Sequence, residues 1–254
     1  MVRNQHQGLS SEQPSLQVQA LFEDNHCLVV NKPGRLLTTE DATGDATLES
    51  AAKDYIREKY NKPGNVYLSL IHRIDRPVTG CVLFARTSKA AARLAALFRE
   101  RKVQKLYLAL VEGNVDSPAG QCLDYLLKDE KTNTSRVVAK DRKNAQHAEL
   151  SWKRLQVLTL KGRAFSLLEV RPVTGRSHQI RVQLSHMGHV IVGDAKYGAS
   201  SRFGEGVIAL HSYGLDFEHP TRDEMICVRA PLPVAGWQDF PLNFINCLTP
   251  LHLP

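Results

Sequence analysis

The stretch HRIDRPVTG, from His72 to Gly80, holds one carboxylate between two arginines. Asp75 lies between Arg73 and Arg76 in a loop that joins two apolar runs, and loops on a rigid sheet often carry active sites. Flanking cations favour the ionised form of a carboxyl group, so this acid suits nucleophilic or electrostatic work better than proton donation. A surface salt bridge would use the same residue types, and the local sequence leaves both interpretations open.

A second polar cluster, RPVTGRSHQIRVQLSHMG, spans residues 171–188. Arg176 comes directly before a segment with helical spacing, and Arg181 lies in the first turns of that segment. The start of a helix has free backbone N–H groups that can bind a phosphate, so the cluster predicts an anion site. Its histidines, His178 and His186, match neither HExxH nor a Cys/His pattern, and we interpret them as solvated or core residues rather than metal ligands.

The overall composition excludes several protein classes. The 254-residue chain is 43% hydrophobic and 23% charged, as expected of a folded soluble protein. Its five cysteines form no CxxC pair, which argues against a disulfide framework or a zinc cluster and favours a reducing compartment. GxGxxG, P-loop and GxSxG motifs are missing, as are the apolar segments of a signal peptide or membrane span. We therefore predict a cytoplasmic protein that binds no membrane.

The formal net charge of +7 is concentrated in one segment. Residues 71–110 hold nine cations and two anions, whereas the rest of the chain has 24 of each sign. A basic segment in a balanced chain indicates a surface that binds polyanions, although a solvated helix face would have the same composition. The nine cations are Arg73, Arg76, Arg86, Lys89, Arg93, Arg99, Arg101, Lys102 and Lys105.

Hydrophobic periodicity predicts the elements that must position these side chains. Helices are predicted over Thr47–Tyr60, from a cap at Ser88 to Phe98, and over Ser177–Met187. Strands are predicted at Val18–Phe22, Cys27–Asn31, Tyr67–Ile71, Gly80–Ala85, Gln104–Val111, Ala148–Leu158, Ala164–Val170, Val190–Val192, Val207–His211 and Met225–Val228, with edge strands at Cys122–Leu127 and Arg136–Ala139. Strands that outnumber helices and come mostly as hairpins predict an α+β fold with a largely antiparallel or mixed central sheet flanked by helices. We find no linker, and predict a flexible tail over residues 1–15 and a single domain over 16–254.

Six stretches of the chain, in order, resemble the RluA-like pseudouridine synthase family. The segment His72–Arg76 is similar to the family's HRLD-type catalytic motif, with Ile74 where leucine is usual and Pro77-Val78 before Thr79-Gly80. The other five are KPG at 32–34, KLYLA at 105–109, TGRSHQIR at 174–181, GDAKYG at 193–198, and LH at 210–211 followed by HP at 219–220. The resemblance covers most of residues 20–230.

The resemblance implies a pseudouridine synthase-type catalytic domain that isomerises uridine in RNA by base flipping, without a metal or cofactor. Asp75 would be the nucleophile, or the carboxylate that stabilises and deprotonates the sugar intermediate, and Arg181 would pair with it. Tyr107 would stack on the flipped uracil and take part in proton transfer. Arg73 would fill the gap that the base leaves.

RNA is therefore the expected partner, and we expect the protein to be a monomer. The chain has no room for the small N-terminal RNA-binding module of many relatives, which favours a tRNA stem-loop over rRNA as the target. The basic segment would supply contacts to phosphates. The candidates for RNA contact are Arg73, Arg76, Arg176, Lys89, Arg93 and Lys102.

Two other functions fit part of the pattern. A non-catalytic RNA-binding protein that retains the fold would explain the basic segment, but an acid at the centre of its RNA site would weaken phosphate binding. A hydrolase of N-glycosidic bonds would need a second carboxylate near Asp75, and the nearest in sequence, Asp54 and Glu100, lie in no motif. The sequence thus favours the isomerase.

Overall fold

The computed structural model describes residues 17–41 and 43–242. The helices are α1 (Leu48–Lys59), α2 (Ser88–Arg99) and α3 (Gln179–His186), with short 3-10 turns η1 (Ala195–Tyr197) and η2 (Trp237–Asp239). The strands are β1 (Gln19–Glu23), β2 (Cys27–Lys32), β3 (Ser69–Leu70), β4 (Thr79–Ala85), β5 (Gln104–Glu112), β6 (Ala119–Asp129), β7 (Thr134–Val138), β8 (Gln146–Leu160), β9 (Arg163–Pro172), β10 (Leu210–Glu218) and β11 (Met225–Arg229). The tail predicted over 1–15 lies outside the described residues.

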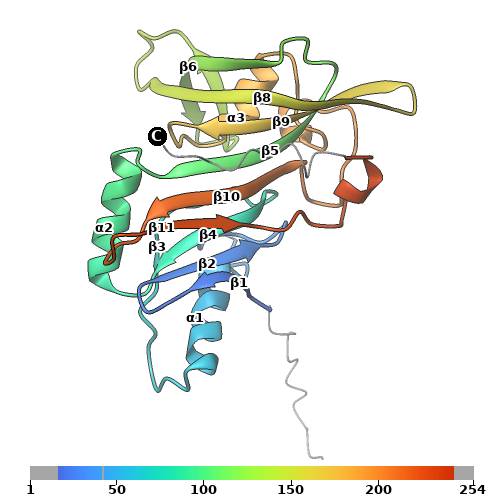
Figure 1. Ribbon diagram of the computed structural model, residues 1–254. Helices are drawn as coiled ribbons and strands as arrows, with labels where there is room; N and C mark the ends of the chain where they lie inside the picture. The colour runs from blue at the N-terminus through green and yellow to red at the C-terminus, as the bar shows by residue number, and fades with distance from the viewer. Residues whose placement is uncertain (1–16, 42, 243–254) are drawn as a thin grey trace, which may run out of the picture.

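These strands form one sheet that runs through the molecule (Figure 1). Its order is β1-β2-β4-β10-β5-β9-β8-β6-β7, with β11 paired to β10 and β3 to β4. Each pairing is antiparallel except that of β4 with β10, which is parallel. The predicted α+β class with a mostly antiparallel or mixed central sheet is confirmed. Among the helices of the described ranges, none has the length and apolar character that a bilayer crossing requires.

The helices pack where the two-residue alternation of the strands exposes apolar side chains. Leu28 of β2 belongs to a cluster with Leu48 of α1, whereas its neighbour Val29 packs in a separate cluster with Leu94 of α2. Since successive strand residues point to opposite faces, α1 and α2 cover opposite faces of the same strands. The third helix, α3, buries Val182 against β6 and β8.

Helix starts differ slightly from the sequence prediction. The first helix was predicted to begin at Thr47, and this residue is the cap of α1. The cap of α2 is Thr87, whose hydroxyl accepts a backbone N–H, and Ser88, the predicted cap, is the first helical residue. Either hydroxyl can serve as a cap, so the sequence did not separate them. α3 begins at Gln179 because His178 has a left-handed backbone, with φ of 53°.

The short strands were predicted least well. β3 has two residues, fewer than Tyr67–Ile71, and Val190–Val192 contributes an isolated bridge instead of a strand. The run Val207–His211 overlaps β10 only at its end. Cys122–Leu127 is not at an edge, because β6 lies between β8 and β7. The edge strand predicted at Arg136–Ala139 overlaps β7, which is at the edge of the sheet. A run of apolar residues indicates that a segment is buried, but it does not indicate which strands the segment pairs with.

The parallel pairing of β4 with β10 brings the end of the HRIDRPVTG motif next to the LH motif at residues 210–211. Its register pairs Thr79 with His211 and Gly80 with Ser212, at the end of the loop that carries Asp75. Gly80 has φ of 111°, and a Cβ atom there would lie 2.2 Å from the carbonyl oxygen of Ser212. Only glycine permits this approach, so it fixes where the loop meets the sheet.

Candidate active site

A cavity of about 350 Å³ lies beside the loop between β3 and β4. Its lining includes five of the residues predicted from the sequence, which come from the loop, from β5 and from the turn before α3 and α3 itself: Arg73, Asp75, Tyr107, Arg176 and Arg181. The volume is within the usual range for sites that bind small molecules or parts of larger ligands. The fold thus brings together side chains that are up to about a hundred residues apart in the sequence.

Asp75 and Arg181 form an ion pair in the wall of this cavity. Arg181 Nη1 donates to Asp75 Oδ2 over 3.1 Å, and the Asp75 side chain keeps 28% of its surface exposed. The backbone around the acid is held from both sides, because Thr38 Oγ1 donates to the carbonyl of Ile74 over 2.7 Å and Val78 N donates to the carbonyl of Asp75. The carboxylate is therefore fixed, charged and accessible.

A second carboxylate holds the same guanidinium from behind. Arg181 donates through Nε and Nη2 to the two oxygens of Asp194, over 2.7 and 2.8 Å, and both side chains are buried. Burial alone would lower the pKa of Arg181, but the hydrogen bonds and charges of Asp194 and Asp75 raise it overall. The guanidinium also lies over the ring of Tyr197, 5.1 Å from its centroid. Arg181 is a permanently charged, fixed donor to Asp75.

Tyr107 of β5 faces the cavity from the sheet. Only 8% of the residue is exposed, and its hydroxyl is hydrogen-bonded to Ser212 of the adjacent strand β10. Burial raises the pKa of Tyr107 to about 12. At neutral pH its hydroxyl therefore stays protonated, and the ring can offer a flat stacking face together with a hydrogen-bond donor.

Two further cavity residues, His72 and Lys105, lie in motifs of the sequence but were not among the predicted site residues. His72 accepts the backbone N–H of Leu83 and stacks on Phe98 of α2, with ring centroids 5.1 Å apart; burial lowers its pKa to about 3, so it is neutral. Lys105 donates to the carbonyl of Thr174 over 2.9 Å, and burial lowers its pKa to about 8. Both residue types are common on surfaces, and only the fold places them here.

The loop that carries Asp75 rests on a fully buried lysine. Lys32 Nζ donates to the carbonyls of Pro33, Leu36 and Arg76, over 2.9, 2.7 and 3.1 Å. Burial lowers the pKa of Lys32 to about 7, partly offset by the charge of Asp75. The amino group of Lys32 thus connects the end of β2 to the loop that carries Asp75.

The other predicted RNA contacts do not line the cavity. Arg76 turns outward, where its guanidinium donates to the carbonyl of Arg35 and pairs with Asp45 over 2.8 Å. Lys89 and Arg93 are exposed on α2, and Lys102, beyond that helix, pairs with Glu100. Their contact with RNA stays a prediction. α2 itself reaches the cavity through Phe98.

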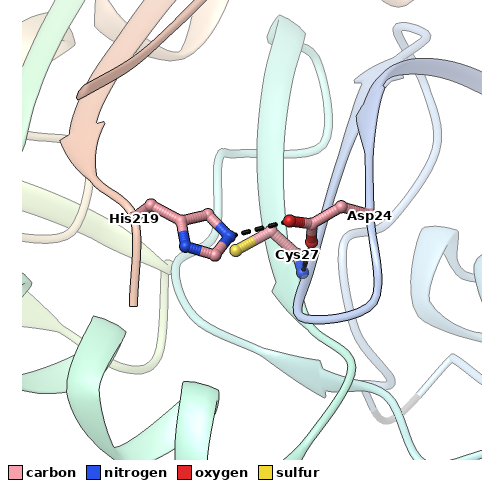
Figure 2. A group of neighbouring side chains, drawn as sticks. All are labelled: Asp24, Cys27 and His219. Atoms are coloured by element: carbon pink, nitrogen blue, oxygen red, sulfur yellow. Dashed lines mark hydrogen bonds and ion pairs between the residues drawn. The ribbon is translucent and has the colours of Figure 1, made fainter. Parts of the chain in front are cut away.

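Away from the cavity, metal-ligating atoms of Asp24, Cys27 and His219 lie within 4.8 Å of one another (Figure 2). His219 Nδ1 accepts the backbone N–H groups of Thr221 and Arg222, which leaves its proton on Nε2, where it is donated to Asp24 over 2.7 Å. The Arg222 side chain donates to the same carboxylate, and burial raises the pKa of the Cys27 thiol to about 12. These hydrogen bonds indicate that the three residues connect the β1–β2 turn to the end of β10, and they do not favour a cation site.

Comparison with known proteins places these motifs in one family. The family profile described as RNA pseudouridylate synthase matches residues 26–186. The ribosomal large subunit pseudouridine synthase C of Vibrio cholerae is 34% identical over 84% of this chain, which spans 65% of that protein's length. The tRNA pseudouridine synthase C of Vibrio parahaemolyticus is 28% identical over 90% of this chain and 96% of its own.

Solved structures agree with the sequence relatives. Human RNA pseudouridylate synthase domain containing 1 superposes with a TM-score of 0.69 at 25% identity, covering 85% of this chain and 84% of the human one. Human RNA pseudouridylate synthase domain containing 4 superposes with the same TM-score and the same identity. The residues that the family profile matches contain the loop of Asp75, the strand of Tyr107 and all of α3, with Arg181. This chain is a member of the RNA pseudouridylate synthase family.

Proposed function

We propose that the protein is an RNA pseudouridine synthase that isomerises uridines in tRNA or rRNA, with Asp75 as the essential catalytic group. The observation that carries the proposal is the accessible Asp75 carboxylate, held by the buried Arg181 at 3.1 Å in a cavity beside Tyr107. Relatives named as ribosomal and tRNA pseudouridine synthases support it, although this chain spans only 65% of the first of them.

The reaction exchanges two bonds without oxidation or hydrolysis. The N1–C1′ glycosidic bond of uridine breaks, a C5–C1′ bond forms, and the hydrogen displaced from C5 leaves to solvent while N1 takes up a proton. Charge develops on the sugar when the base departs, and a fixed carboxylate beside it lowers that barrier. Asp75 would act there, either by a covalent bond to the substrate or by stabilising and deprotonating the sugar intermediate.

The neighbouring side chains would divide the remaining tasks. Tyr107 would stack on the flipped uracil and, with its pKa near 12, act as a hydrogen-bond donor rather than as an anionic base. Arg73, which lines the cavity, would fill the position in the RNA that the flipped base leaves. Lys105 and Arg176 at the same cavity would bind the phosphates on either side of the target nucleotide.

The target RNA is a separate part of the proposal. A structured stem-loop, in tRNA first and in rRNA second, offers a uridine whose extrusion costs only a few kcal/mol. Pseudouridine mapping in RNA from cells with and without the gene identifies the site directly.

Tritium release from RNA labelled at the 5-position of uracil tests the reaction. We expect release by the wild-type protein, with intact RNA and no free uracil, and less than about 1% of that rate with Asp75→Asn, because several kcal/mol of barrier lowering depend on the charge. Asp45→Asn is the matched control, since Asp45 pairs with Arg76 outside the cavity. RNA binding without release would instead support a non-catalytic RNA-binding protein, and free uracil would support a hydrolase.

A further inference from the structure

His178 lies next to the catalytic carboxylate and has no role in the reaction as described so far. It precedes α3 with a left-handed backbone, φ 53°, and its side chain is only 8% exposed. A non-glycine residue rarely adopts this conformation, so the surrounding structure must hold it there.

A chain of hydrogen bonds fixes the orientation of this imidazole. The backbone N–H of Ser135, on β7, donates to Tyr197 Oη over 2.9 Å, and the same hydroxyl lies 2.9 Å from His178 Nδ1. The Ser135 N–H can only donate, so Nδ1 is the partner of this pair that can accept the hydrogen of the Tyr197 hydroxyl, and the arrangement favours donation to Nδ1. Nδ1 is then an acceptor, and a neutral imidazole carries its proton on Nε2.

The protonated nitrogen faces the reacting acid. His178 Nε2 lies 3.8 Å from Asp75 Oδ2, the same oxygen that accepts from Arg181 Nη1. This separation is too long for a hydrogen bond, but a movement of roughly 0.8 Å would make one. Two donors directed at Oδ2 would leave Oδ1 as the oxygen presented to the sugar.

We propose that His178, held as the Nε2–H tautomer by Tyr197, is a positioning residue that donates to Asp75 Oδ2 as the carboxylate reacts. The inference rests on the proposed function, since it concerns the same carboxylate. Burial lowers the pKa of His178, although the nearby Asp75 raises it, and Arg181, Lys196 and Asp194 are the other charged groups that act on it. The neutral form required here is therefore the one present at pH 7.

Two substitutions of His178 distinguish the effect of side-chain length from the effect of the left-handed backbone. Asparagine tolerates a left-handed backbone and can still contact Tyr197, but its amide does not extend to Asp75. The longer glutamine amide can occupy the position of Nε2. His178→Asn should lower the single-turnover rate constant tenfold to about a hundredfold with unchanged RNA affinity, as expected for one lost hydrogen bond to a charged group. His178→Gln should recover most of the rate, and His186→Asn, on the exposed end of α3, should leave it unchanged.

Histidine ¹⁵N NMR of the RNA-free protein provides a readout that does not depend on turnover. We expect Nε2–H for His178 in the wild type and a mixture of tautomers in Tyr197→Phe, whose rate should fall less than that of His178→Asn. A protonated Nδ1 in the wild type, or wild-type rates with His178→Asn, would overturn the assignment. Absence of tritium release by the wild type would overturn the proposed function instead, while the tautomer would still be measured.

Discussion

The two carboxylates on Arg181 predict a distinct result for Asp194→Asn. Asp194 is 1% exposed and accepts two hydrogen bonds from the guanidinium, at 2.7 and 2.8 Å. Removing one partner of a buried ion pair usually costs 3–5 kcal/mol, roughly. Asparagine keeps one acceptor and Asp75 still neutralises the arginine, so we expect a loss of about 3 kcal/mol in the free energy of unfolding. For a chain of this size that is a decrease of roughly 6–12 °C in Tm.

The same change should also slow the reaction. With only one carboxylate left, the guanidinium is no longer held from behind and can rotate onto both oxygens of Asp75. The acid would then be more fully neutralised and wrongly oriented, and we expect the single-turnover rate constant for tritium release to fall at least about tenfold. The rate is measured well below the Tm of the variant, so that all molecules are folded.

Asp216→Asn provides the matched control. Asp216 is fully buried and accepts from both Nη atoms of Arg229, but neither residue lines the cavity. It should lower Tm by a similar amount and leave the rate unchanged. If Asp194→Asn lowers Tm but retains the wild-type rate, Asp194 supports only the fold and the reasoning about Arg181 is wrong. If both variants slow the reaction equally, the loss is a general effect of destabilisation.

Four further predictions concern the cavity and its surroundings. Tyr107→Phe should preserve RNA affinity and slow the single-turnover rate about tenfold or more if the hydroxyl donates during the reaction; an unchanged rate would restrict Tyr107 to stacking. Gly80→Ala should lower the free energy of unfolding by about 3 kcal/mol, measured by denaturant titration, because its Cβ would lie 2.2 Å from a backbone oxygen of β10. Lys105, with its pKa lowered to about 8, loses its charge as pH rises through 8, so RNA affinity should fall between about pH 7 and 9, and Lys105→Met should remove that pH dependence. Lys89→Ala with Arg93→Ala should flatten the salt dependence of RNA binding by a slope of roughly 0.7 to 0.9 per lost contact, and an unaltered slope would identify these side chains as a solvated face.

The sequence predicted the parts of the fold that depend on local pattern. The helix over Thr47–Tyr60 and the long hairpin of β8 and β9 have strong periodicity and clear turns, and both are present. The predicted length of β3 and the predicted edge position of β6 were wrong, because pairing depends on strands that are distant in sequence.

The site was predicted where chemistry and motif coincide. Asp75 stood out as an acid between arginines, and its pairing with Arg181 was expected from the family resemblance and is present in the structure. His178 was interpreted as a solvated or core residue. Asp194 and Lys32 belong to motifs of the family resemblance, but no role was predicted for them. Each of these three acts through a contact that only folding creates, so residue type and spacing gave no signal for it.

The sharing of one guanidinium by two carboxylates has a consequence for how RNA would enter. Asp75 and Arg181 line the cavity and Asp194 pairs with Arg181 behind them, so these three groups together carry one net negative charge, whereas Arg73, Lys105 and Arg176 add cations to the lining. At roughly 6 Å and an effective dielectric of 20, a phosphate would be repelled from the inner wall by about 3 kcal/mol. If the proposed function holds, uncharged uracil and ribose would enter the cavity while the phosphates stay beside the cations, so the nucleotide would enter base first.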